Sequence, residues 1–225
     1  LEKRVGNLEK KAKGGDKEAK LTLDLVLRAK VLLEEGKPAR HTKRPPEEEK
    51  AFAMLQLLTA LPVLYVCNVN EADAARGNAQ SKSVQARAKQ ESAACVIICA
   101  QMEAEFAALS DKDQAEFLAA AGLDESGLNR LIHAGYDLLG LQTFFTVGPK
   151  EARAWTIHKG WTAPQAAGII HTDFEKGFIR AETIAYEDYV KCNGEQGAKE
   201  AGKMRLEGKD YVVREGDVMH FRFSS

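Results

Sequence analysis

The sequence has no continuous apolar run of the ~20 residues that a membrane-spanning helix needs. Its first twenty residues are rich in Lys and Glu and lack the features of a secretory signal. We therefore expect a cytoplasmic protein that does not enter a membrane. Only four cysteines occur in 225 residues, in separate apolar contexts: Cys67, Cys95, Cys99 and Cys192. We expect free, buried thiols in a reducing compartment.

Motifs for several kinds of chemistry are also missing. The phosphate-binding pattern Gly-x-x-x-x-Gly-Lys-Ser/Thr does not occur, because the three Gly-Lys pairs continue into Pro38, Met204 and Asp210. No serine lies in a Gly-x-Ser-x-Gly context, so a hydrolase triad is unsupported. Cys95 and Cys99 are four residues apart, but no second cysteine pair or nearby histidine completes a zinc site. The sequence predicts no catalytic residue and no metal ligand within this chain.

Charge is unevenly distributed, although the net charge is only −1. Residues 1–45 carry 13 Lys and Arg against 7 Asp and Glu, whereas residues 46–142 carry 7 against 14. Residues 143–225 are balanced, with 12 of each sign. A basic arm beside an acidic body favours a polyanionic partner at the arm. A solvated helix surface explains the same pattern, and charge alone leaves both interpretations open.

Residues 1–45 are predicted to form a helical hairpin. Apolar residues recur at three- and four-residue steps along 1–13, Gly14-Gly15 breaks this pattern, and Asp16 is placed to cap a second helix. Pro45-Pro46 and the acidic residues after it mark another helix, expected to run through Leu58 and to stop before Pro62. Because the chain starts at Leu1, without Met and inside an expected helix, we expect further protein to precede it.

The next segment alternates strands and helices, which is typical of a parallel α/β sheet. The strands at 62–69 and 94–99 are short apolar runs, expected to be buried on both faces. Expected helices lie at 82–91, 111–121 and 126–139. After residue 148 the pattern becomes that of a small α+β module: strands at 153–157 and 178–184, a helix at 163–170 with a Thr162/Gln165 capping box, and a hairpin joining 211–213 to 218–223.

The best candidate site is Asn68-Val69-Asn70-Glu71, directly after the first buried strand. Ligands of open parallel sheets bind outside the carboxyl ends of the strands. Nucleotide-binding proteins of the GTPase class place Asn-Lys-x-Asp there, with the Asp accepting from two donors of guanine. Here Val69 replaces the Lys and Glu71 the Asp, so we expect weaker guanine selectivity and tolerance of adenine. An Asn that only forms a turn is the alternative.

Other candidates are weaker. The second strand ends in Cys99-Ala100, where the same superfamily has Ser-Ala and uses a backbone amide against the base. A small residue pair leaving a sheet explains this equally well. His171 beside Asp173 fits acid–base chemistry or, more simply, a loop cap. The aromatic residues around Trp155 and Phe174, with their Lys and Arg neighbours, fit an RNA-stacking face or the core of a small module.

Several long stretches resemble one family, the YchF or Obg-like ATPases. The most specific is Thr-Ala-Pro-Gln-Ala-Ala-Gly-Ile-Ile-His-Thr-Asp-Phe at 162–174. The others lie at 57–66, 68–71, 153–157, 177–182, 206–213 and 216–218. The resemblance covers essentially the whole chain. It implies an α/β fold with part of a P-loop NTPase parallel sheet, an α-helical hairpin arm, and a C-terminal α+β β-grasp domain of the ubiquitin-like TGS type.

The resemblance also implies domains and site residues. The arm would be 1–45, the C-terminal half of the nucleotide-binding domain 46–142, and the TGS domain 143–225. Asn68 and Glu71 would read the base. Val69 would provide a backbone contact and pack on the ring, and Cys99 and Ala100 would contribute a further backbone contact. Magnesium ligands and catalytic elements would precede Leu1, so this chain alone should be inactive.

The function implied is that of a monomeric, ribosome-associated ATPase that binds ATP with Mg²⁺, with this chain selecting the base. The alternative is a non-catalytic module in which the basic arm and the TGS domain bind ribosomal RNA or protein, and nucleotide only regulates that binding.

Overall fold

The computed structural model describes residues 1–224 of the chain. The chain divides into two compact units, the first running from Leu1 to Val63 and the second beginning at Leu64. The three domains expected from the sequence, with boundaries after residues 45 and 142, do not coincide with these two units, and they stay a prediction. None of the helices described among these residues combines the length and the apolarity that crossing a membrane demands.

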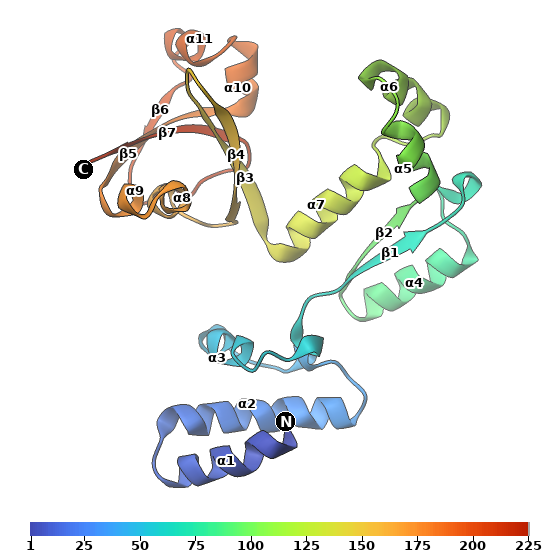
Figure 1. Ribbon diagram of the computed structural model, residues 1–225, viewed down its shortest axis with the longest axis vertical. Coiled ribbons are helices and arrows are strands. Elements are labelled where there is room, and N and C mark those ends of the chain that lie inside the picture. The colour runs from blue at the N-terminus through green and yellow to red at the C-terminus, as the bar shows by residue number, and fades with distance from the viewer. Residues whose placement is uncertain (225) are drawn as a thin grey trace. The chain divides into compact units, whose positions relative to one another are not determined.

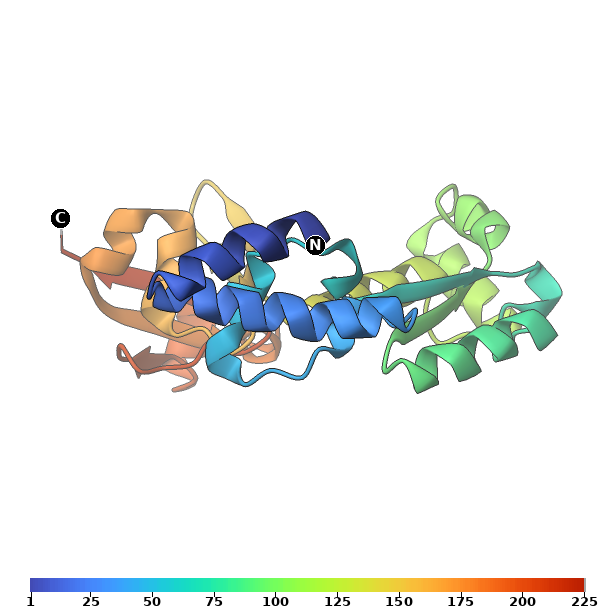
Figure 2. The same cartoon turned by 90° about the horizontal axis from the view of Figure 1, so that it is seen from below.

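The first unit is built around the predicted helical hairpin. Helices α1 (Glu2–Lys13) and α2 (Lys17–Glu34) lie side by side, as Figures 1 and 2 show. Asp16 caps α2 as expected, because its Oδ1 accepts a hydrogen bond of 3.0 Å from the Ala19 amide. Leu25 and Val26 of α2 are fully buried, so the hairpin presents an apolar side to the rest of its unit.

The segment after the hairpin covers this apolar side with short helical turns. They are the 3₁₀ turns η1 (Ala39–His41) and η2 (Pro46–Glu48), the helix α3 (Glu49–Ala53) and the 3₁₀ turn η3 (Leu58–Ala60). The continuous helix expected to run through Leu58 is therefore wrong. Gln56 has a φ of 53°, a left-handed conformation that is incompatible with an α-helix. Phe52 and Leu55 still pack into the core of the unit.

The second unit begins with two parallel strands, β1 (Leu64–Asn68) and β2 (Ala94–Ile98), connected through α4 (Ala79–Gln90). This confirms the expected strand–helix–strand order. Three helices follow: α5 (Ala100–Phe106), which was not predicted, α6 (Asp111–Ala120) and α7 (Gly127–Leu139). The register pairs the last residues of both strands, so their carboxyl ends meet at one edge.

The prediction that these strands are buried on both faces is wrong for the described residues. Val66 in the middle of β1 keeps 45% of its surface exposed. Within residues 1–224, β1 and β2 pair only with each other, and α4 and α7 pack against them. Two strands with two helices leave part of the pair uncovered, because a fully buried parallel strand needs neighbours on both edges and layers on both faces.

The remainder of the second unit is a five-stranded sheet with the order β4-β3-β7-β5-β6. Its strands are β3 (Leu141–Val147), β4 (Ala152–His158), β5 (Phe178–Ala185), β6 (Arg205–Glu207) and β7 (Asp217–Phe223). Its helices are α8 (Ala163–Ile170), α9 (Thr172–Lys176), α10 (Tyr186–Lys191) and α11 (Glu195–Glu200). The strands are antiparallel to their neighbours except β3 and β7, which are parallel.

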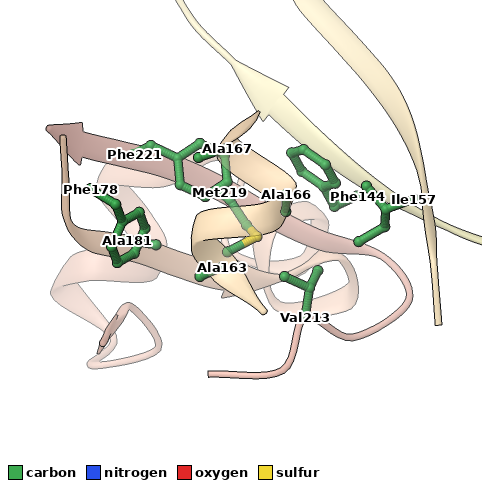
Figure 3. Close-up of a cluster of buried hydrophobic side chains, with 10 residues drawn as sticks. All are labelled: Phe144, Ile157, Ala163, Ala166, Ala167, Phe178, Ala181, Val213, Met219 and Phe221. Atoms are coloured by element: carbon green, nitrogen blue, oxygen red, sulfur yellow. The ribbon is translucent and has the colours of Figure 1, made fainter. Parts of the chain in front are cut away.

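The core of this sheet lies against α8, as Figure 3 shows. Phe144, Met219 and Phe221 point from the strands toward the small residues Ala163 and Ala166 of the helix. Alanines let the helix approach the sheet closely, which matches the dense packing of protein interiors. The predicted capping box fixes the start of α8, because Gln165 Oε1 accepts a hydrogen bond of 2.9 Å from the Thr162 amide.

The predicted hairpin between 211–213 and 218–223 is wrong in its first arm. Only β7 forms, and its alternation is as expected, with Met219 and Phe221 buried and His220 exposed. Residues 211–213 instead pair with the chain that leads into α8. The Ala163 amide donates to the Tyr211 carbonyl at 2.8 Å, and the Val213 amide donates to the Trp161 carbonyl at 3.0 Å.

Candidate functional site

Asn68, the last residue of β1, begins the candidate site. The next residue, Val69, is nearly buried, and its amide donates to the Ile98 carbonyl at 2.9 Å, which continues the pairing with β2 by one step. Glu71 is exposed and opens the 3₁₀ turn η4 (Glu71–Asp73). The turn starts only three residues after Asn68, so the side-chain amide of Asn68 and the carboxylate of Glu71 both lie at the carboxyl end of β1.

The side chain of Asn68 links the ends of both strands. Its Oδ1 accepts a hydrogen bond of 3.0 Å from the Ala100 amide, 32 residues further along the chain. Cys99, the residue before Ala100, is buried and forms the N-cap of α5. The structure thus brings Asn68, Cys99 and Ala100 together. The Ala100 amide, which was expected to face a base, donates its hydrogen bond to Asn68 instead. The Nδ2 group of Asn68 has no hydrogen-bond partner among residues 1–224.

The loop between η4 and α4 is held tightly. Asn78 caps α4 in a capping box with Ser81, and the Gly77 amide donates to the Asp73 carbonyl at 2.6 Å. Gly77 has a φ of 67°, and an added Cβ would clash with Ser81 and lie 2.8 Å from Ile97. Only glycine fits here without strain. The loop that carries Glu71 is therefore anchored at its far end to β2 and α4.

Glu103 was not singled out from the sequence, yet it fixes the helix that follows the site. Its Oε1 and Oε2 accept hydrogen bonds from the Gly127 amide at 2.7 Å and the Leu128 amide at 3.1 Å. A carboxylate at a helix N-terminus is favoured by the helix dipole and by the free amides there. Glu103 lies 24 residues before Gly127, so no local sequence signal reveals this contact.

Two of the cysteines lie close to each other beneath the candidate site. The Sγ atoms of Cys67 on β1 and Cys95 on β2 are 3.9 Å apart, and all four cysteines are free thiols. Burial, together with the neighbouring Cys67, raises the pKa of the Cys95 thiol to about 11. A thiol of this kind is protonated at neutral pH and is a poor nucleophile. The expected free thiols are confirmed, although only Cys99 is fully buried.

The weaker candidates have structural roles. His171 accepts a hydrogen bond of 3.2 Å from the Asp173 amide through Nδ1 and so caps α9, which confirms the simpler of the two interpretations. Trp155 packs on the core of the five-stranded sheet, where its Nε1 donates to Thr146 Oγ1 at 2.8 Å. Phe174 packs on the same core. These aromatic side chains are accounted for by packing.

These features define a mixed α/β protein that carries polar side chains at the carboxyl ends of a parallel strand pair. Residues 141–224 match the family model described as "YchF-GTPase_C: Protein of unknown function (DUF933)". Over 223 residues the chain is 53% identical to the "Ribosome-binding ATPase YchF" of Haemophilus influenzae, covering 99% of this chain and 61% of that protein. The Bacillus subtilis protein of the same name is 49% identical over all of this chain and 62% of its own length.

Proteins from eukaryotes are also similar to this chain. "Obg-like ATPase 1" of Pongo abelii is 40% identical over 98% of this chain and 57% of its own length. The solved structure of the Schizosaccharomyces pombe YchF GTPase superposes with a TM-score of 0.80 at 31% identity, over 98% of this chain and 61% of that one. The chain belongs to the YchF, or Obg-like, ATPase family. It spans about three fifths of the length of these relatives.

Proposed function

We propose that this chain provides the base-recognition part and the C-terminal domain of a cytoplasmic, ribosome-associated ATPase. The observation that carries the proposal is the hydrogen bond between Asn68 and Ala100, which draws the two strand ends together where α/β sheets bind ligands. The names of the relatives support binding and hydrolysis of ATP and association with ribosomes. In this proposal the Cys99-Ala100 pair positions Asn68 through the Ala100 amide, in place of the direct contact between that amide and the base.

The proposed selectivity for adenine rests on donor and acceptor chemistry. Guanine offers two adjacent N–H donors to a carboxylate, whereas adenine offers one exocyclic amine beside an acceptor nitrogen. Glu71, one methylene longer than Asp, places its oxygens away from the guanine pair, and Val69 offers an apolar surface to either ring. Relatives of this chain are named both as an ATPase and as a GTPase, so the selectivity has to be measured rather than taken from names.

In this proposal, residues of the whole protein that lie outside this chain bind the phosphates and the magnesium ion. A triphosphate with Mg²⁺ is held by backbone amides, a Lys and a Ser or Thr of a glycine-rich loop. That pattern is missing from the 225 residues, so they do not fit the role. We place the phosphate loop and the magnesium ligands before Leu1. The part of this chain in the reaction is to orient the nucleoside end of ATP.

We also propose that residues 143–225 form a β-grasp domain of the TGS type. The support is the mixed sheet with β7 between β3 and β5, and the helix α8 packed across it. This module and the basic arm, residues 1–45, are the surfaces we assign to the ribosome. The alternative of a non-catalytic binding module is distinguished by ATP turnover in the whole protein, which it would lack.

Replacing Asn68 by alanine should weaken ATP binding to the whole protein by about 1–3 kcal/mol, roughly fivefold to 150-fold. The variant loses both the link to Ala100 and the free Nδ2 donor. Isothermal titration calorimetry checks this. Asn70→Ala is the matched control, because Asn70 is an exposed neighbour whose side chain caps nothing. Equal affinities of the Asn68 variant and the unmodified protein would remove Asn68 from the site.

Replacing Glu71 by aspartate should shift the preference of the whole protein from ATP toward GTP by about tenfold or more, because a well-placed pair of hydrogen bonds to a base discriminates by about 1–3 kcal/mol. Competition between the two nucleotides measures the ratio. Glu71→Gln keeps the length and removes the charge, so it should not favour GTP. An unchanged ratio in the aspartate variant would exclude Glu71 as the selectivity residue.

If the basic arm contacts ribosomal RNA, binding to ribosomes should weaken steeply with salt. Substituting Lys10, Lys11 and Lys13 by Gln should lower the salt slope by about one unit for each phosphate that the arm no longer neutralises. Sedimentation with ribosomes at several salt concentrations measures it. A control of equal charge change replaces the exposed lysines Lys82, Lys89 and Lys112, which lie outside both surfaces assigned to the ribosome. A flat salt dependence of the unmodified protein would exclude the arm as an electrostatic contact.

A further inference from the structure

Three side chains of types that can bind a metal ion meet on the face of the five-stranded sheet opposite to α8. They are Glu182 on β5, His220 on β7 and Glu195, the first residue of α11. One ligand atom of each lies within 4.8 Å of the other two. The three come from separate elements that are distant along the chain, so no local sequence pattern reveals the group.

The backbone fixes the positions of these residues. Glu182 and His220 are directly opposite each other in the antiparallel pairing of β5 and β7, so their side chains leave the same face of the sheet side by side. Glu195 follows Gly194, whose φ of 113° is available to glycine. The Gly194 amide donates to the Tyr189 carbonyl at 2.8 Å. This anchored turn directs the start of α11 to the two strands.

The floor beneath the three side chains is apolar. Ile184 and Val218 are buried, and together with Glu182, Glu195 and His220 they line a cavity of about 10 Å³. That volume corresponds to about one water-sized sphere. An apolar floor lowers the local dielectric and strengthens the attraction between a cation and its ligands. The cavity is therefore sized for a single ion rather than for an organic ligand, and a water bound to the ion would lie on the solvent side, where Glu195 and His220 are exposed.

Arg222 supports one of the carboxylates without blocking it. Its Nε and Nη2 donate to Glu182 Oε1 and Oε2 at 3.3 and 3.0 Å. These hydrogen bonds hold the pKa of Glu182 below its ordinary value, so the carboxylate is ionised at neutral pH. A carboxylate has about four lone-pair positions, and Arg222 uses two of them. Hydrogen-bonded carboxylates of this kind are common among metal ligands.

We propose that Glu182, Glu195 and His220 bind one divalent transition-metal ion of the Zn²⁺ type, with water in the remaining position. An imidazole with two carboxylates suits Zn²⁺ and its neighbours, whereas Mg²⁺ and Ca²⁺ prefer oxygen ligands alone. Ligand atoms around a tetrahedral Zn²⁺ lie roughly 3.4 Å apart, given bonds of about 2.0–2.2 Å. The ion would tie β5, β7 and α11 together.

Titration of the full chain with CoCl₂, followed by visible absorption, tests the proposal. Bound Co²⁺ in a low-symmetry site gives visible bands, and ZnCl₂ should displace them at one equivalent. We expect His220→Ala and Glu195→Gln each to weaken the binding by about tenfold or more. Glu195 is exposed, so its variant should fold normally even if the His220 variant does not.

The matched control is His133→Ala, because His133 is an exposed histidine that is paired with a carboxylate, Glu125 at 3.4 Å, outside the proposed site. It should leave Co²⁺ binding unchanged. Absorption from thiolate-to-cobalt charge transfer would place the ion on cysteine and overturn the proposal. So would the absence of visible bands, or bands that are unaffected by Glu195→Gln.

Discussion

Replacing Phe144 by alanine should lower the free energy of unfolding of the second unit by about 3–5 kcal/mol. Phe144 is completely buried in β3, stacked on Trp155 with ring centroids 6.5 Å apart and edge-on to Phe221 at 5.8 Å. The alanine variant lacks these ring contacts and leaves a cavity between the sheet and α8. Urea denaturation followed by tryptophan fluorescence measures the destabilisation, because Trp155 lies directly against the deleted ring.

The neighbouring residue provides the control. Phe145 lies on the opposite face of the same strand, only half-buried, with its ring 5.6 Å from Tyr186. Phe145→Ala removes the same number of atoms, yet it should cost markedly less because water already reaches part of this ring. Equal destabilisation by the two variants would contradict the assignment of the α8 side as the core of the sheet.

Elements with local signals were predicted well from the sequence. The helix α8 begins and ends at the expected residues, Ala163 and Ile170. Its start is set by Thr162 and Gln165, three residues apart, and this capping box forms as expected. The Asp16 cap is local in the same way. In these cases the interacting groups lie within one helical turn, so a short stretch of sequence contains the whole interaction.

Elements that depend on distant partners were predicted less well. Tyr211 and Val213 alternate like a strand, but their backbone groups pair with residues 161 and 163, about 50 positions earlier. The strand β3 was missed, although Gly140, the left-handed C-cap of α7, precedes it and Gly148-Pro149 follows it. Apolar alternation shows that a segment is extended; it does not show which edge of a sheet receives it.

The candidate site also contains features with a local sequence signal and features that depend on distant partners. The Asn68-to-Glu71 motif is continuous in the sequence and follows a strand that the structure confirms. Its link to Ala100 depends on the register of two parallel strands, which the sequence does not specify. Glu103 and the Glu182–Glu195–His220 group depend on tertiary contacts. The role of the motif in base recognition stays a prediction, which the Asn68 and Glu71 variants test.

Replacing Asp217 by alanine should lower the free energy of unfolding by about 3 kcal/mol. Asp217, the first residue of β7, is 2% exposed and accepts hydrogen bonds from three groups: the Tyr211 hydroxyl at 2.7 Å, the Arg214 amide at 2.9 Å and Arg205 Nη2 at 3.2 Å. Burial, aided by the bond to Asp217, raises the pKa of Tyr211, so its hydroxyl remains a donor at neutral pH. Alanine would leave this hydroxyl and the Arg214 amide without their acceptor.

Two further variants distinguish the effect of losing the buried hydrogen bonds of Asp217 from the effect of losing a negative charge. Asp210→Ala removes an exposed carboxylate nearby and should change stability by no more than about 0.5 kcal/mol. Tyr211→Phe removes one of the three donors and should cost about 1 kcal/mol. In the double variant with Asp217→Ala, the combined destabilisation should be less than the sum of the two, because both substitutions remove the same hydrogen bond. Full additivity in urea denaturation would mean that Tyr211 and Asp217 stabilise β7 independently, contrary to the network described.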